Sequence, residues 1–243
     1  TSLLNSEFGV EGVTNLRTLN DVMPRGQQRP IRRANPLWHH LGAWWIWEEH
    51  WDEFWGGLVQ RDTAQVVRAT QFLQAEGLRY AVEANRRRKF QNSGSLPWQF
   101  NEPYPMAACT SAVDYYARPK AAYYAVARAY APLLLSARFA RIAWEGKEPF
   151  SATVWTNHSG SLELKDAMLQ ARLVAANGKV WSRDEKFISL AANSAKEQLA
   201  LQADLEALTA DVFFLELILQ HSDGHVMAQN CYPFTKGPSL APL

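Results

Sequence analysis

The spacing of apolar residues changes at about Leu134, and this change indicates that the chain consists of two parts with different architectures. Before that point, short apolar runs alternate with longer segments of helical period, an order typical of folds with parallel strands. After it, short alternating runs follow one another with turn sequences between them, which is typical of an antiparallel β-sandwich. The pattern therefore predicts an α/β domain over residues 1–133 and an all-β domain over residues 134–243.

Two strand–loop–helix units are expected in the α/β part. Residues 3–8 form a short apolar run, and a helical period follows over residues 62–89. Residues 96–100 form a second run, and Pro119 begins a second helical segment that Pro132 ends. Because a helix that follows a buried strand covers a parallel sheet, this order predicts two βα units.

The all-β part is marked by short apolar or alternating segments separated by turn residues. In residues 194–208 the apolar residues alternate as in a strand although the composition favours a helix, and we assign a strand from the context. The other predicted strands are 139–144, 151–156, 168–175 and 213–220.

A long connection, residues 10–57, lies between the first strand and the first helix and is expected to hold short helical pieces. A connection of this length in a compact domain is usually functional. Dense indoles either pack in a core or line a sugar-sized pocket, since aromatic faces stack on pyranose rings, and composition leaves both open. The chain has ten Trp residues, and this connection holds Trp38, Trp44, Trp45, Trp47, Trp51 and Trp55.

Charge and cysteine content exclude several classes of function. With 25 Lys and Arg against 24 Asp and Glu, the net charge of +1 argues against nucleic acid or an anionic membrane as a partner. No segment is long and apolar enough to span a bilayer. Cys109 and Cys231 give neither a disulfide framework nor metal spacing, and both are predicted to be buried free thiols. No glycine-rich phosphate loop follows either strand, so no nucleotide cofactor is expected.

Several motifs in the α/β part occur in the order and spacing of a known family. The chain resembles the C-terminal portion of family 2 glycoside hydrolases, closest to the β-mannosidase and exo-β-glucosaminidase branch. The resemblance implies that residues 1–133 are the last two βα units of a (β/α)₈ TIM barrel, and residues 134–243 an immunoglobulin-like β-sandwich. The motifs are Ser6–Gly9, Gln74–Glu83 with Arg86, Gly94–Pro105, Asp114–Lys120 with Tyr123 and Tyr124, and, in the sandwich, Asp223-Gly224 and Asn230–Phe234.

The resemblance also implies roles for single residues. Glu7, at the end of strand seven, would be the nucleophile of a retaining exo-β-glycosidase, and Trp98, at the end of strand eight, a wall that faces the sugar. Asn101 and Glu102 follow Trp98 and are candidate substrate-binding residues. Glu102 is not assigned as the acid/base, because the acid/base of such barrels lies on strand four, before the nucleophile. An acid that only caps its loop is the alternative for Glu102.

His39 and Trp44, in the Trp-rich connection, complete the candidate substrate-binding residues. The ring of His39 could bond sugar hydroxyls, and a structural histidine is the alternative. No metal is expected, because no third ligand has suitable spacing. Cys109 stands where the family commonly has Trp or Ser, which implies a different pocket wall.

These inferences predict a hydrolase fragment that carries a nucleophile but lacks the acid/base and is inactive alone. Its expected partners are a β-linked carbohydrate and the missing N-terminal part of the same enzyme. The alternative is a non-catalytic carbohydrate-binding or structural module in which Glu7 no longer acts. The sugar and the linkage are not fixed by this sequence.

Overall fold

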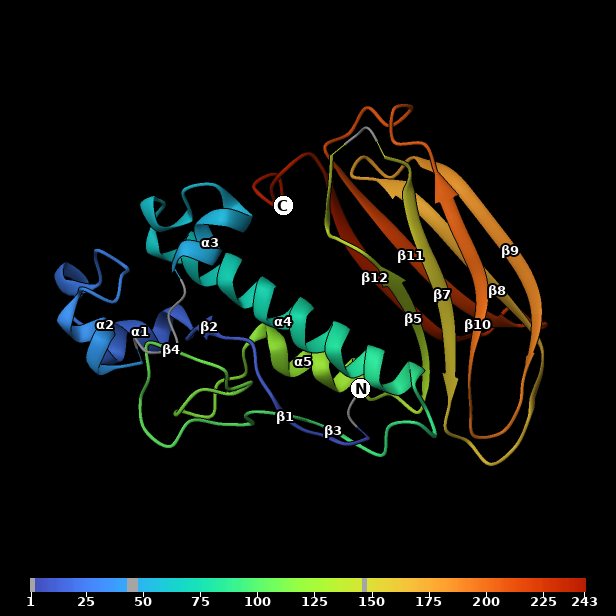
Figure 1. The fold of residues 1–243 in the computed structure, drawn as a ribbon, viewed down its shortest axis with the longest axis horizontal. Helices are drawn as coiled ribbons and strands as arrows, with labels where there is room; N and C mark the ends of the chain where they lie inside the picture. Colours follow the sequence, from blue (N-terminus) through green and yellow to red (C-terminus); the bar gives the residue numbers. More distant parts are fainter. Residues whose placement is uncertain (1–2, 43–47, 146–147) are drawn as a thin grey trace. The chain divides into compact units, whose positions relative to one another are not determined.

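The computed structural model describes residues 3–42, 48–145 and 148–243, with the backbone alone for Val59 (Figure 1). The chain divides into two compact units. The first consists of Thr1–Asn85 and Phe90–Tyr130, and the second of Arg86–Lys89 and Ala131–Leu243.

Short strands and helices surround one long helix, α4, in the first unit. Strands β1 and β3 pair in parallel, with Asn5 opposite Ser95 and Phe8 opposite Pro97. The predicted order of strand, long connection, helix, strand, loop and helix is confirmed. The elements are β1 (Asn5–Phe8), β2 (Gly12–Val13), α1 (Leu16–Val22), η1 (Arg25–Gln27), α2 (Pro36–His40), α3 (Glu48–Trp55), η3 (Leu58–Gln60), α4 (Thr63–Arg87), β3 (Ser95–Pro97), β4 (Ala108–Cys109) and α5 (Ala121–Ala129).

The second predicted strand and the second predicted helix differ from the observed elements at their boundaries. The strand expected over 96–100 ends at Pro97, since proline lacks the N–H group that a ladder needs. The helix begins at Ala121 and not at Pro119, because Pro119 forms an antiparallel bridge with Val113 and is therefore extended.

Helix α4 buries polar side chains as well as apolar ones, and these hold the short strand β2. The backbone N–H of Val13 donates to Thr70 Oγ1 at 3.1 Å, and Gln71 Nε2 donates to the carbonyl of Val13 at 3.1 Å. Gln74 Nε2 donates to the carbonyl of Cys109, in strand β4, at 3.2 Å and to that of Ser111 at 3.0 Å.

None of the described helices is long and apolar enough to cross a membrane.

Two β-sheets face each other in the second unit (Figure 1). Among the described residues, one sheet has the strand order β10-β7-β5 and the other β6-β12-β11-β8-β9. All pairs are antiparallel except β6 with β12. The strands are β5 (Leu133–Phe139), β6 (Ala143–Trp144), β7 (Phe150–His158), β8 (Leu164–Ala175), β9 (Val180–Leu190), β10 (Ser194–Ala203), β11 (Val212–His221) and β12 (Val226–Lys236).

The core of the sandwich follows the two-residue period of its strands. In β11 every second residue is buried, from Phe213 to Leu219. Phe150 on β7 of the other sheet lies with its ring centroid 5.5 Å from that of Phe213 and 5.0 Å from that of Phe234 on β12. Aromatic rings from both sheets therefore meet in one cluster.

Most of the predicted strands of this unit are confirmed, including the strand assigned within 194–208, which is β10. The prediction of a strand over 139–144 is wrong, because β5 ends at Phe139 and β6 begins only at Ala143. Strands β9 and β12 were not predicted. The central residues of β9 are exposed and polar, so no apolar alternation marks them.

The two cysteines are free, as expected, but only one of them is buried. Cys109 is buried in β4, whereas Cys231 is exposed, so the prediction that both are buried is wrong for Cys231. Cys231 precedes the buried Tyr232 in β12, and alternation along a strand turns neighbouring side chains to opposite faces.

We expect Phe213→Ala to lower the free energy of unfolding of the second unit by about 3–5 kcal/mol, because it leaves a cavity in the aromatic cluster. Phe187→Ala is the matched control, since Phe187 is 77% exposed, and should change it by less than about 0.5 kcal/mol. Amide hydrogen exchange in β8 and β12 measures this unit separately. Equal effects of the two variants would contradict the assignment of the core.

Candidate active-site residues

The paired strands of the first unit bring Glu7 and Trp98 to the same edge. The backbone N–H of Trp98 donates to the carbonyl of Phe8 at 2.6 Å, directly after Glu7. Glu7 is exposed in β1, and Trp98 is 44% exposed just past β3. A Cβ atom on Gly9 would lie 2.6 Å from the Trp98 carbonyl oxygen, so this close approach requires the glycine of the Ser6–Gly9 motif.

The two candidates that follow Trp98 occupy different environments. Asn101 is exposed and forms a parallel bridge with Val113. Glu102 is only 2% exposed, and its carboxylate accepts hydrogen bonds from Ser111 Oγ at 2.7 Å and from the backbone N–H of Tyr115 at 3.2 Å. This arrangement favours the alternative in which Glu102 organises its own loop.

The carboxyl group of Glu102 has a pKa above its usual value. Burial is the main cause, and the hydrogen bond from Ser111 and the positive charge of Lys120 oppose it. A backbone N–H, that of Met106, also lies 3.4 Å from Oε2. Glu102 is thus a buried acid whose carboxylate oxygens accept hydrogen bonds from groups of the loop that follows it.

The candidates from the Trp-rich connection are not joined to this edge by any described contact. His39 is exposed at the end of α2, and no hydrogen bond among the described residues links it to Glu7 or Trp98. Trp44 lies outside the described residues. No group of three His, Cys, Asp or Glu residues within the described chain could hold a metal ion.

Three other Trp residues of this connection pack in the core. Trp38, Trp51 and Trp55 are buried, and Trp38 Nε1 donates to the carbonyl of Gln28 at 2.9 Å. For these three the core interpretation is correct, and a sugar-lining role is excluded by their burial.

Lys120, which the sequence did not single out, is fully buried at the N-cap of α5. Its ammonium Nζ donates to the carbonyl of Cys109 at 3.0 Å and lies 3.4 Å from that of Gly12. Burial lowers the pKa of Lys120 to about 8, and the negative charge of Glu102 is the largest opposing effect. Its only signal in the sequence is its place in the Asp114–Lys120 motif.

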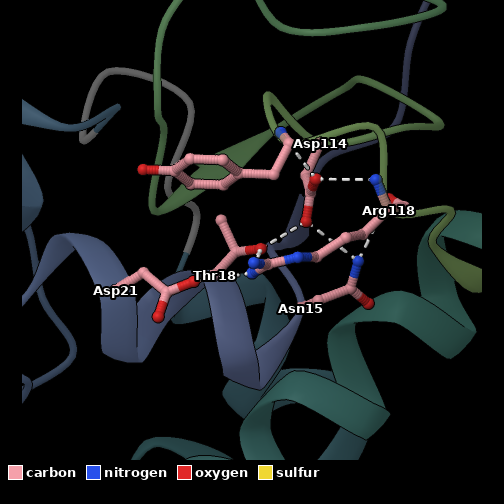
Figure 2. A network of polar contacts seen from close by, with 6 residues as sticks. Asn15, Thr18, Asp21, Asp114 and Arg118 are labelled. Carbon is pink, nitrogen blue, oxygen red and sulfur yellow. Dashed lines mark hydrogen bonds and ion pairs between the residues drawn. The ribbon is translucent and has the colours of Figure 1, made fainter.

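A hydrogen-bonded network centred on Asp114 joins α1 to the loop before α5 (Figure 2). Asp114 Oδ2 accepts from Asn15 Nδ2 at 3.1 Å and from Thr18 Oγ1. Its Oδ1 accepts from the backbone N–H groups of Arg118 at 2.9 Å and Tyr116 at 3.0 Å. Burial opposes ionisation, but these hydrogen bonds together outweigh it and hold the pKa of Asp114 below its usual value.

Arg118 extends the network across α1. Its Nη1 donates to Thr18 Oγ1 and to Asp21 Oδ2, both at 2.8 Å (Figure 2). Because α1 lies near the start of the Trp-rich connection, the network fixes this part of the connection to the loop that follows Glu102.

Comparison with solved structures shows the fold of a class of glycosidases. The β-D-mannosidase of Dictyoglomus thermophilum matches 95% of this chain and 27% of its own chain, with a TM-score of 0.74 and 22% identity. The exo-chitosanase of Amycolatopsis orientalis matches 96% of this chain and 27% of its own chain, with a TM-score of 0.77 and 17% identity. At these identities the likeness shows the fold alone.

Comparison of sequences points to the β-mannosidases in particular. The chain is 30% identical over 148 residues to β-mannosidase B of Aspergillus niger, a match that covers 58% of this chain. No family model matches the chain. The predicted resemblance to the β-mannosidase and exo-β-glucosaminidase branch of glycoside hydrolase family 2 is confirmed. The match spans only 17% of the length of that relative.

We expect Asp114→Asn to lower the free energy of unfolding of the first unit by about 1–3 kcal/mol at pH 7, because a buried ionised acceptor is lost. The folded pKa of Asp114 lies below its ordinary value of 3.8, so its stabilisation is present above about pH 4 and is lost as the pH falls through the folded pKa.

The stability curves of the two proteins should therefore converge in acid. Asp184→Asn, at an exposed position on β9, is the control that should match the wild type at every pH. Urea titrations between pH 3 and pH 7 measure the difference. A gap between wild type and Asp114→Asn that stayed constant down to pH 3 would contradict the network.

Proposed function

We propose that this chain is the part of a retaining exo-β-glycosidase that carries the catalytic nucleophile, Glu7. The observation that carries the proposal is that Glu7 is exposed on β1, directly before Phe8, whose carbonyl accepts a hydrogen bond from the backbone N–H of the half-exposed Trp98 past β3. A retaining glycosidase needs an ionised carboxylate below the sugar and a second carboxyl group as acid/base. The relatives by sequence are β-mannosidases, which supports this class of reaction.

We further propose that residues 1–133 are the last two βα units of a TIM barrel. The parallel pairing of β1 with β3, each followed by a helix, supports this assignment. In such barrels the catalytic groups lie at the carboxyl ends of strands, where Glu7 and Trp98 lie here. For residues 134–243 the two-sheet sandwich supports an immunoglobulin-like domain.

The proposed substrate is a β-linked glycoside, with a β-mannoside as the first choice. Trp98 would stack on the sugar. Asn101, which is exposed and follows Trp98 closely in the sequence, would form a hydrogen bond with a hydroxyl group of the sugar. His39 and Trp44 stay candidates for the same role. Glu102 would act indirectly, by holding the loop that follows Trp98.

The acid/base would come from a part of the enzyme that precedes these residues. Glu102 does not fit that role, because its carboxyl group is buried and bonded within its loop. Two barrel strands also leave an open edge at β1. The chain alone is therefore expected to be inactive, and the N-terminal part of the same enzyme is its proposed partner.

Labelling with 2-deoxy-2-fluoro-β-mannosyl fluoride tests the proposed nucleophile. The probe should be used on a chimera in which this chain replaces the similar segment of Aspergillus niger β-mannosidase B. Mass spectrometry should find the fluorosugar on Glu7, because the 2-fluoro group slows hydrolysis of the glycosyl-enzyme. Glu7→Gln should abolish labelling, and Glu163→Gln, at an exposed position, should leave it unchanged.

The chain alone should neither be labelled nor hydrolyse 4-nitrophenyl β-mannoside. Binding of mannosides by the chimera without labelling of Glu7 would refute the proposal and favour a non-catalytic carbohydrate-binding module. Normal turnover by the isolated chain would refute the claim that it lacks the acid/base.

A further inference from the structure

The first unit buries the ammonium group of Lys120 completely, although burying a charge is costly. Its two carbonyl neighbours belong to different strands, Gly12 to β2 and Cys109 to β4. These two residues are also opposite one another in the antiparallel β2–β4 ladder. Lys120 thus lies against both strands of the ladder at the same position.

The chain between Glu7 and this ladder has little room to move. A Cβ atom on Gly9 would lie 2.9 Å from the methyl group of Thr110, and one on Gly12 would lie 2.7 Å from Gln74 Oε1. Only four residues lie between Glu7 and Gly12. A shift of Gly12 would therefore be passed along a short segment, closely packed at Gly9 and Gly12, to Glu7.

The carboxylate groups that attract the ammonium group of Lys120 come from the segment after Glu7 and from the loop after Trp98. Its charge is attracted by Glu102 most strongly, and also by Asp114 and Glu11. Glu11 lies on the segment after Glu7, while Glu102 lies on the loop after Trp98. A single cation is thus balanced by carboxylates from both segments.

We propose that Lys120 is a positioning residue, which ties the segment that leaves Glu7 to strand β4 and so fixes Glu7 relative to Trp98. The inference rests on the proposed function for the role of Glu7. The tie itself, meaning the hydrogen bonds from Lys120 to the carbonyl groups of Gly12 and Cys109, does not depend on that function. A neutral apolar side chain of similar length would fill the space without donating to the two carbonyl groups. The two buried carboxylates, Glu11 and Glu102, would then also lose their shared cation.

The thiol of Cys109 provides a local probe of this tie in the chain itself. It is buried beside Lys120, whereas Cys231 is exposed and can be removed as Cys231→Ser. In that background, Lys120→Met is expected to raise the rate of alkylation of Cys109 by iodoacetamide at least tenfold, because β4 opens locally. Lys165→Met removes an exposed lysine of the second unit and should leave the rate unchanged.

The expected opening is local, so hydrogen exchange in β7 and β11 should be unchanged in Lys120→Met. An unchanged Cys109 rate in a folded Lys120→Met protein would overturn the proposal. If Lys120→Met does not fold, acetylation of the wild-type lysines with acetic anhydride decides, because an ammonium held inside the fold between two carbonyl groups should be protected. Acetylation of Lys120 as fast as that of the exposed Lys165 would overturn the proposal.

The effect on Glu7 is measured in the chimera with 4-nitrophenyl β-mannoside. Lys120→Met should lower kcat about tenfold with KM within twofold, since a displaced nucleophile still permits binding of the sugar. Unchanged kcat together with faster alkylation of Cys109 would overturn the positioning role. An inactive chimera would count against the proposed function, while the alkylation rates would still decide the tie.

Discussion

The first unit depends on hydrogen bonds that buried side chains make to the backbone of β2 and β4. Each of these strands has only two residues, too few for a ladder to be stable by itself. Thr70 and Gln71 of α4 bond to Val13, and Gln74 and Lys120 bond to Cys109. The backbone that follows the candidate nucleophile is therefore held by polar groups that water does not reach.

The second unit is stabilised in a different way. Its strands are long, and its core is an apolar cluster built from both sheets. Loss of one ring there removes packing but leaves no unpaired charge, whereas loss of Lys120 leaves buried carboxylates without their cation. Changes in the sandwich should therefore act on stability, and changes near β2 and β4 on the geometry of the strand ends.

Periodicity predicted the parts of the fold in which packing dominates. Helix α4 and strand β11 have long, regular apolar patterns, and both were predicted to within a few residues. Strand β9 was missed because its central residues are exposed and polar. The segment 139–144 was misassigned because a short turn interrupts an apolar run there. The pattern of apolar residues over so few positions cannot distinguish such a turn from a strand.

The candidate site was predictable only where a motif marks it. The Ser6–Gly9 motif singled out Glu7, and the structure explains its glycine by the contact with Trp98. The burial of Glu102 and the buried position of Lys120 depend on contacts between segments far apart in sequence, which no local pattern encodes. A lysine after a proline would ordinarily be read as an exposed helix start.

The most direct test of the account is a crystal structure of the chimera with Aspergillus niger β-mannosidase B, bound to a non-hydrolysed mannoside. The distance to measure joins the carboxyl group of Glu7 to the nearest carboxyl group contributed by the other part of the protein. A retaining pair predicts about 5–5.5 Å, with the sugar between the two groups and against Trp98. A separation of about 6.5–9.5 Å, or a sugar bound away from Glu7, would contradict the assignment of Glu7 as the nucleophile.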